Sequence, residues 1–262
     1  MKPSTLNKLI DQDFGTVSKG IERFISDYIS ESSVKGLILG LSGGLDSSVV
    51  LKLCVNALGP SRVFGVMMPS DNTPKEDVEH AIDLAKSLGV KYRVIDIVSI
   101  MKKYEEILPA DKRARGNLMA RIRMNILYYY AAINSYLVAG TSDKSEVEIG
   151  YYTKFGDGAA DIMPIAGLYK TQVRALAKFL DLPPDIVEKK SSPRLWADHL
   201  AEEEIGMDYE TIDQILYLLV DRKASPEDAA KRLGIPAEQV NKIKDMMEKN
   251  LHKRSPVPIP RL

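Results

Sequence analysis

The chain has 262 residues, 45% of them hydrophobic and 27% charged, a composition typical of a folded globular protein rather than a disordered one. Because 36 Lys and Arg residues balance 36 Asp and Glu residues, no overall charge favours nucleic acid or an anionic membrane as a partner. The single cysteine, Cys54, excludes an internal disulfide, and no apolar stretch reaches the length of a membrane span. The N-terminus lacks the apolar core of a secretion signal, so we expect a cytoplasmic protein.

Short apolar runs alternate with helical stretches through the first half of the chain. An N-terminal helical segment from Leu6 to about Tyr28, hinged near Gly15, precedes them. The runs, which are typical of strands buried on both faces, are residues 36–41, 63–68, 92–97 and 137–140. The helices between them are predicted to end at Leu58, to run from an N-cap at Thr73 to Leu88, and to cover residues 115–136. This alternation predicts an α/β fold, a doubly wound, Rossmann-like parallel sheet flanked by helices.

The rest of the chain is predicted to be mostly helical. Val173, Leu176, Ala177 and Leu180 have the spacing of an amphipathic helix, whereas residues 189–207 are expected to form a long loop. Ser225 and Pro226 indicate the start of a further helix that ends at Gly234. We divide this single domain into an N-terminal helical segment (1–34), an α/β core (35–185), and an active-site loop with a small helical C-terminal region (186–262).

A glycine-rich string follows the first predicted strand and opens a helix. Its residues are Ser42, Gly43, Gly44, Leu45, Asp46 and Ser47. Backbone N–H groups converge at such a turn and can bind a phosphate at the positive end of the helix. Neither the Walker pattern nor the dinucleotide pattern G-x-G-x-x-G is present, which disfavours an ordinary kinase or dehydrogenase. Without further context, Asp46 could also be a simple helix cap.

The glycine-rich string resembles the pyrophosphate loop of the N-type ATP pyrophosphatases. Two further blocks, residues 140–146 (GTSDKSE) and 152–170 (YTKFGDGAADIMPIAGLYK), narrow the resemblance to ammonia-dependent NAD synthetases over roughly residues 20–255. That resemblance implies an ATP- and Mg²⁺-dependent ligase that amidates deamido-NAD with ammonia through an adenylated intermediate. A glutamine-hydrolysing version would need a further domain with its own nucleophile, and Cys54 shares a helix face with apolar residues.

The resemblance also assigns the site residues. It implies that Asp46 and Glu146 bind Mg²⁺ and, with Lys170, form the catalytic set. ATP is expected to contact Lys170 and the residues Gly40, Leu41, Ser42, Gly43, Gly44, Leu45, Asp46, Ser47, Thr141 and Ser192. Deamido-NAD is expected to contact Arg121, Lys154, Asp161, His252 and Lys253. Arg123 lies two residues from Arg121, so only one of the two is expected to face the ligand.

Some expectations depart from the family or compete with it. The stretch at residues 191–199 (SSPRLWADH) departs from the family pattern, which leaves the closure of this loop open. The resemblance implies a symmetric homodimer, with the N-terminal helix and the helix at 115–136 as interface elements. The alternative with the same chemistry is the ATPase subunit of a GMP synthetase. A nucleic-acid-binding role rests on a loose helix-turn-helix pattern at residues 229–236 and is disfavoured, as is a membrane role.

Overall fold

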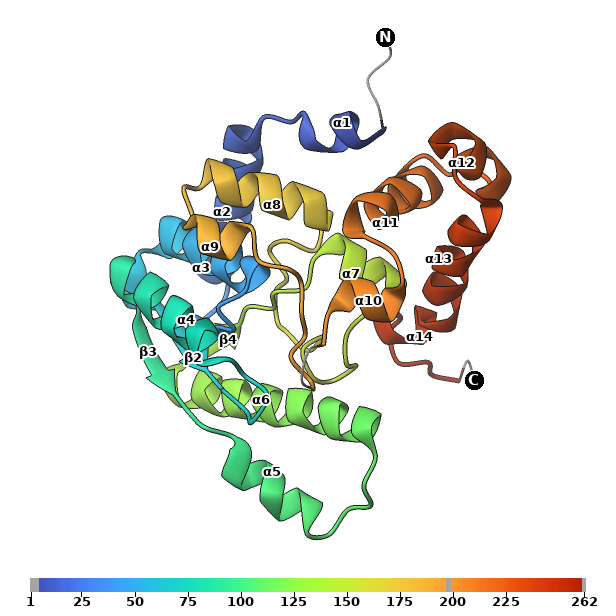
Figure 1. Ribbon diagram of the computed structural model, residues 1–262. Helices are drawn as coiled ribbons and strands as arrows, with labels where there is room; N and C mark the ends of the chain where they lie inside the picture. The colour runs from blue at the N-terminus through green and yellow to red at the C-terminus, as the bar shows by residue number, and fades with distance from the viewer. Residues whose placement is uncertain (1–4, 197–198, 261–262) are drawn as a thin grey trace.

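A parallel sheet is the centre of the fold in the computed structural model, which describes residues 5–196 and 199–260 (Figure 1). Its four strands are β1 (Gly36–Gly40), β2 (Val63–Met67), β3 (Lys91–Val94) and β4 (Tyr136–Val138), in the spatial order β3-β2-β1-β4. All pairings are parallel, with Leu37 of β1 opposite Val63 of β2 and Leu137 of β4. The predicted α/β fold is confirmed. The chain adds β2 and β3 on one side of β1 and later adds β4 on the other side. The carboxyl ends of β1 and β4 therefore border a crevice, which is where such sheets bind ligands.

Strand β1 explains why helices cover both faces of the sheet. Leu37 and Leu39 point to one face and Ile38 to the other, and all three are fully buried. The helices that bury Leu37 and Leu39 are α2 (Phe14–Glu31), α3 (Leu45–Leu58), α4 (Lys75–Ser87), α8 (Lys170–Phe179) and α9 (Pro184–Val187). The helices on the opposite face are α5 (Val98–Glu105) and α6 (Lys112–Asn134). A short 3-10 turn, η1 (Pro60–Arg62), leads into β2.

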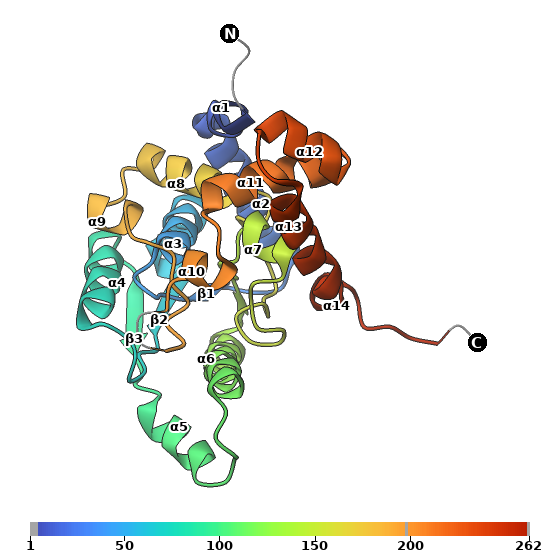
Figure 2. The ribbon, with the colours of Figure 1, turned by 45° about the vertical axis from the view of Figure 1, so that its right-hand side comes forward.

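A third hydrophobic cluster holds the C-terminal helices together beside the sheet (Figures 1 and 2). Leu9, Ile149 and Tyr169 join this cluster from earlier parts of the chain. Its helices are α1 (Thr5–Ile10), α7 (Lys144–Ile149), α10 (Ala201–Ile205), α11 (Tyr209–Leu216), the π-helical turn η2 (Tyr217–Asp221), α12 (Pro226–Leu233) and α13 (Ala237–Lys249). The short helix α14 (Leu251–Arg254) follows α13 and leads to the extended C-terminal residues. Helix α7 therefore links the C-terminal helices to the carboxyl edge of the sheet.

Several boundaries differ from the sequence predictions for identifiable reasons. Thr73 does not cap α4, which begins at Lys75, because its hydroxyl is used by the turn before the helix and accepts a hydrogen bond from the Ser70 N–H. The N-terminal helices break at Asp13, whose side chain caps α2, and Gly15 lies inside that helix. Residues 189–207 contain helix α10 as well as loop, and strand β3 ends at Val94, well before Ile97. None of the described helices has the length and hydropathy needed to cross a bilayer.

The first prediction concerns Cys54, which lies fully buried in the middle of α3. Burial raises the pKa of this thiol to about 12, so both access and ionisation oppose its reaction. We expect a water-soluble disulfide reagent to leave Cys54 unmodified in the native protein and to label it in denaturant, as followed by absorbance or mass spectrometry. Rapid labelling of the native protein at neutral pH would contradict this packing.

Candidate active site

The glycine-rich loop connects the carboxyl end of β1 to the first turn of α3. Gly43 adopts a φ of +71°, and a Cβ at this position would lie 1.9 Å from the carbonyl oxygen of Asp77. The loop is closed by its own hydroxyls: the Gly44 N–H donates to Ser42 Oγ over 3.2 Å, and the Ser48 hydroxyl donates to the Gly44 carbonyl over 2.7 Å. The sequence therefore produces the tight turn that a phosphate-binding backbone requires.

Asp46 lies in the first turn of α3 and does not cap it, because the N-cap residue is Gly44. Its carboxylate instead contacts Lys170, the first residue of α8. Lys170 Nζ lies 2.8 Å from Asp46 Oδ2, 2.9 Å from Asp143 Oδ2 and 3.0 Å from Glu146 Oε1. One ammonium thus contacts three carboxylates, which we call the Lys170 cluster (Asp46, Asp143, Glu146 and Lys170). The sequence predictions for Asp46, Glu146 and Lys170 come together at this point.

Helix α7 supplies two of the three carboxylates through its N-terminal capping box. Asp143 accepts a hydrogen bond from the Glu146 N–H over 2.8 Å, and the Glu146 side chain accepts one from the Asp143 N–H over 3.4 Å. This reciprocal pairing fixes both side chains on the same turn. Asp143 was missed in the sequence, although the spacing Asp-x-x-Glu of a capping box was readable there.

The charges of the Lys170 cluster are unbalanced. Burial alone would lower the pKa of Lys170, but the charges of Asp143, Asp46 and Glu146 raise it well above its usual value. Burial raises the pKa of Glu146 to about 8, against the opposing effect of Lys170, and also raises the pKa of Asp143. The three carboxyl groups outnumber the single ammonium, and a bound cation would favour their ionised forms, so this part of the site is suited to a further cation.

Asp213, from α11, ties the helices of the Lys170 cluster together. Its carboxylate accepts a hydrogen bond from the Ser145 hydroxyl over 2.5 Å and one from the Thr171 N–H over 2.8 Å. The Ser145 hydroxyl oxygen in turn accepts from the Lys170 N–H over 3.0 Å. Asp213 is fully buried, so these bonds are shielded from water. It was not identified from the sequence, because only the fold brings α11 to the N-termini of α7 and α8.

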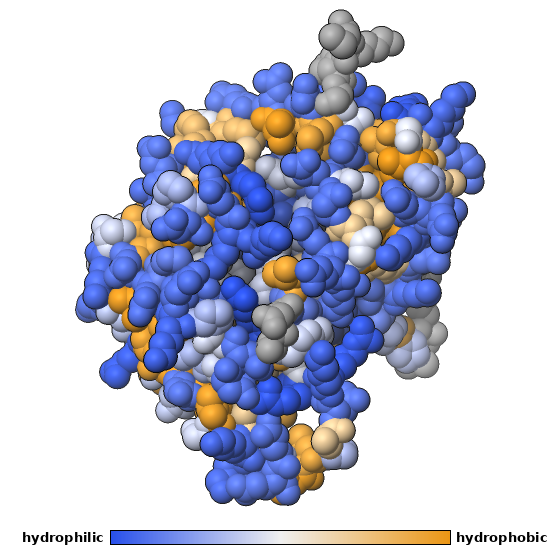
Figure 3. Space-filling view, viewed as in Figure 1, coloured by the Kyte–Doolittle hydropathy of each residue, from blue (hydrophilic) through white to orange (hydrophobic). Residues whose placement is uncertain are grey.

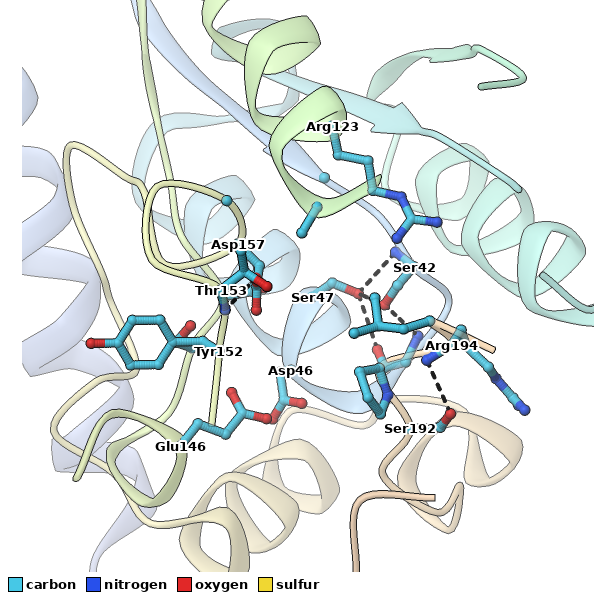
Figure 4. A pocket seen from close by; sticks show the side chains of 18 of the residues that line it. Ser42, Asp46, Ser47, Arg123, Glu146, Tyr152, Thr153, Asp157, Ser192 and Arg194 are labelled. Atoms are coloured by element: carbon cyan, nitrogen blue, oxygen red, sulfur yellow. Dashed lines mark hydrogen bonds between the residues drawn. The ribbon is translucent and has the colours of Figure 1, made fainter. Parts of the chain in front are cut away.

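A cavity of about 750 Å³ opens beside the Lys170 cluster. Figure 4 shows the carboxylates of Asp46 and Glu146 close together in its wall, with Ser42 and Arg123 farther along it. The cavity is also lined by the predicted ATP-binding residues Gly40, Leu41, Gly44, Leu45, Ser47, Thr141 and Ser192. Of the predicted set, Gly43 and Lys170 do not belong to the described lining. The volume and the lining suit a nucleotide-sized ligand.

The predicted deamido-NAD residues fall into two groups. Lys253 lines the cavity, where its ammonium donates to the carbonyl oxygens of Gly150 and Tyr152 over 2.6 and 2.8 Å. Lys154 lies outside the described lining, and its ammonium donates to the His252 carbonyl over 2.6 Å. Arg121 donates to the Lys154 carbonyl over 3.3 Å, so Arg121, Lys154 and His252 form one partly exposed group.

Asp161 occupies a different position, at the end of β4. Its carboxylate accepts a hydrogen bond from the Val138 N–H over 2.7 Å and one from the Tyr128 hydroxyl over 3.4 Å. The carboxylate therefore pairs with the backbone at the end of β4. Its predicted contact with deamido-NAD stays a prediction.

Arg121 and Arg123 of α6 point in different directions, as their spacing predicts. Arg123 lines the cavity and donates to the Met68 carbonyl over 3.1 Å, whereas Arg121 is exposed and outside the described lining. Burial lowers the pKa of Arg123 to about 10, which still leaves it charged at neutral pH. Arg123 is thus a cavity residue that the family pattern did not assign.

The loop after α9 adds further cations to the cavity. Lys189 Nζ lies 2.6 Å from Asp77 Oδ1 and donates to the Gly43 carbonyl over 3.1 Å. Arg194 Nε lies 3.0 Å from the other oxygen of Asp77. Neither residue was identified from the sequence: Arg194 belongs to the stretch that departs from the family pattern, and Lys189 was placed in the predicted long loop without a role. Asp77, which is buried on α4, fastens this loop to the glycine-rich loop.

The buried Asp213 generates a pH-dependent stability prediction. Burial raises its pKa to about 7, so its contribution to stability is greatest at low pH and is lost as the pH rises through that value. Between about pH 4 and pH 8, the free energy of unfolding of the wild type should fall by on the order of 4 kcal/mol more than that of Asp213→Asn. Urea unfolding at several pH values measures this difference. Asp245→Asn, on an exposed face of α13, controls for the loss of one carboxylate, and parallel curves for wild type and Asp213→Asn would contradict the prediction.

Comparison with known proteins assigns the chain to a family. The family model described as NAD synthase matches residues 17–257. An NH(3)-dependent NAD(+) synthetase from Hyperthermus butylicus is 51% identical over 98% of this chain and 94% of its own length. Among solved structures, an NH3-dependent NAD synthetase from Campylobacter jejuni has a TM-score of 0.82 and 32% identity, covering 95% of this chain and all of its own. An NMN synthetase from Francisella tularensis has a TM-score of 0.85 and 31% identity, covering 96% of this chain and all of its own. The chain therefore belongs to the NAD synthase family.

Proposed function

We propose that the protein amidates the nicotinate carboxylate of deamido-NAD with ammonia, consuming ATP and releasing AMP and pyrophosphate. The observation that carries the proposal is the Lys170 cluster at the glycine-rich loop, in a chain of the NAD synthase family. Acyl adenylation needs a phosphate cradle, cations for the leaving pyrophosphate and a shielded cavity. All three lie together at the carboxyl ends of β1 and β4.

The phosphates of ATP are proposed to bind at the glycine-rich loop and the N-terminus of α3. Thr141 and Ser192 reach the same cavity from two other segments. Lys170 contacts the lining residues Asp46 and Glu146, and its ammonium is placed to neutralise charge that develops as pyrophosphate departs. Arg123, whose guanidinium lines the wall, adds a second fixed positive charge.

The residues present fit a magnesium ion. Asp46 and Glu146 offer hard carboxylate oxygens to the cavity, and Asp46 Oδ1 is buried without a hydrogen-bond partner among the described residues. These two side chains would hold the ion, as the family pattern implies. When bound, Mg²⁺ supplies charge neutralisation and orientation of the phosphates.

The proposed reaction has two steps. The nicotinate carboxylate attacks the α-phosphorus of ATP, and pyrophosphate leaves to give the acyl adenylate. Ammonia then attacks the acyl carbon, AMP leaves with the electron pair of the broken C–O bond, and the nitrogen releases one proton to solvent to give the amide. No covalent bond to the protein is needed, and Cys54 is buried in the core rather than placed in the cavity. Free ammonia is the proposed nitrogen donor.

We further propose that the active form is a homodimer. Arg121, Asn125, Tyr129 and Ile133 are exposed on one stripe of α6, at i, i+4 spacing. Tyr129 is 67% exposed and Ile133 62% exposed, so the stripe is apolar at one end and carries Arg121 at the other. A partner packed on this stripe would lie next to the group formed by Arg121, Lys154 and His252. These residues would then bind deamido-NAD at the edge of the interface.

The activity itself is the next prediction. Purified protein with ATP, Mg²⁺ and deamido-NAD should form NAD⁺ and equimolar AMP when ammonium is supplied, and little when glutamine replaces it. Asp46→Asn should reduce the rate by at least about a hundredfold, because the loss of a fixed charge at developing charge costs several kcal/mol. Coupled NAD⁺ detection and chromatography of AMP measure both products.

Two other substrates, each of which would accept ammonia in place of deamido-NAD, make the assay more specific. Nicotinate mononucleotide tests the reaction named for the Francisella tularensis neighbour, and xanthosine monophosphate tests the GMP synthetase alternative. We expect deamido-NAD to be amidated most efficiently of the three. A higher kcat/KM with either of the other acceptors would transfer the function to that reaction.

The interface prediction uses Ile133→Asp. A charge at the apolar end of this stripe should convert the dimer to monomer and raise the KM for deamido-NAD, while the fold remains intact. Light scattering after size exclusion gives the mass, and steady-state kinetics give the KM. Val94→Asp is the matched control, because Val94 is an exposed apolar residue (46%) away from the proposed interface. It lies on β3, the edge strand farthest from β4, against which α6 packs. A monomeric but fully active wild type would contradict the proposal.

A further inference from the structure

The Lys170 cluster already contains a cation, the ammonium of Lys170, which occupies the place between the carboxylates that a metal ion would need. The ammonium lies within 3.0 Å of three carboxylates and is only 1% exposed. No group of three His, Cys, Asp or Glu residues in the part of the chain that the structure describes is ready to hold a metal ion. The carboxylates are instead arranged around Lys170.

The three carboxylates are not equivalent. The side chains of Asp46 and Glu146 are 22% and 20% exposed and line the cavity. Asp143 is fully buried behind them and does not belong to the described lining. Asp46 and Glu146 can therefore turn to a ligand in the cavity, whereas Asp143 can serve only Lys170 and the cap of α7.

We propose that Lys170 is a resident cation that closes the metal site in the nucleotide-free protein. This inference rests on the proposed role of Asp46 and Glu146 as magnesium ligands. A divalent ion bound to these two carboxylates would lie close to the ammonium and be repelled by it. The ion therefore binds only together with ATP, whose phosphates give the displaced ammonium a new partner.

Asp143 determines where Lys170 goes. When Asp46 and Glu146 turn to the metal ion, the pairing of Lys170 Nζ with Asp143 Oδ2, 2.9 Å in the free protein, is retained. The ammonium stays charged and stays at the base of the cavity, facing the phosphates. Leaving the buried carboxylate of Asp143 unpaired would cost far more than this small rearrangement.

The test measures metal binding without catalysis. Mn²⁺, which also prefers carboxylate oxygens, is titrated into nucleotide-free protein and its free concentration is followed by electron paramagnetic resonance. We expect weak binding by the wild type and at least about tenfold tighter binding by Lys170→Met, which leaves three carboxylates around an apolar side chain. Lys144→Met is the matched control, because Lys144 pairs with Asp221 and with no other carboxylate of the described residues, so its removal should leave Mn²⁺ binding unchanged.

Unpaired carboxylates could prevent Lys170→Met from folding without metal. A second variant, Lys170→Met with Asp143→Asn, removes one buried charge and retains Asp46 and Glu146. Its melting temperature should rise with Mn²⁺ in the absence of nucleotide, whereas that of the wild type should not. Tight Mn²⁺ binding by nucleotide-free wild type, or no gain of Mn²⁺ binding or stabilisation in the lysine variants, would overturn the inference.

A further arm separates this inference from the proposed function. With α,β-methylene-ATP present, the wild type should bind Mn²⁺ in the ternary complex, and Asp46→Asn should bind it at least about tenfold more weakly. If nucleotide-dependent binding occurs but the lysine variants gain nothing, the metal site stands and Lys170 is not its gate. If no Mn²⁺ binds even with nucleotide, the proposed metal role itself fails.

Discussion

The pairing of one buried ammonium with three carboxylates is the interaction on which the site depends. Lys170 comes from α8, Asp46 from α3, and Asp143 and Glu146 from α7, so the cluster joins three helix N-termini. A buried charge without partners costs several kcal/mol, and these four residues are therefore interdependent. The sheet makes the cluster possible, because the loops after β1 and β4 leave the same edge on neighbouring strands.

The C-terminal helices support this cluster rather than forming a separate unit. Asp213 of α11 receives hydrogen bonds from Ser145 and Thr171, the residues next to Glu146 and Lys170. Tyr169, the N-cap residue of α8, extends the connection, since its hydroxyl donates to Asp221 over 3.0 Å. A movement of α11 would therefore shift Ser145 and Thr171 and, with them, the Lys170 cluster. The geometry of the site thus depends on the hydrophobic packing of the C-terminal helices.

The sequence was most informative where the backbone itself imposes a requirement. The glycine-rich string was readable because a close approach to Asp77 admits no side chain at Gly43, and the strands were readable because burial on both faces demands apolar runs. Asp213 and Arg123 were harder to predict, because their partners lie far away in sequence, and the capping box of Asp143 gave no sign of its distant partner Lys170. The residues after α9 were also poorly predicted, since ion pairs with Asp77, and not a local pattern, hold Lys189 and Arg194 in place.

A chain with no net charge has to gather its cations locally in order to bind polyphosphates. Lys189 and Arg194 reach the cavity from the loop after α9, Arg123 from α6, and Lys253 from α14. Hydrophilic side chains cover most of the face in Figure 3, so charge alone does not distinguish the site from the rest of the surface. The distinction comes from enclosure, because cations fixed on three separate segments around one cavity act in a lower dielectric than cations spread over a surface. The fold thus concentrates at one sheet edge a positive charge that the composition as a whole does not have.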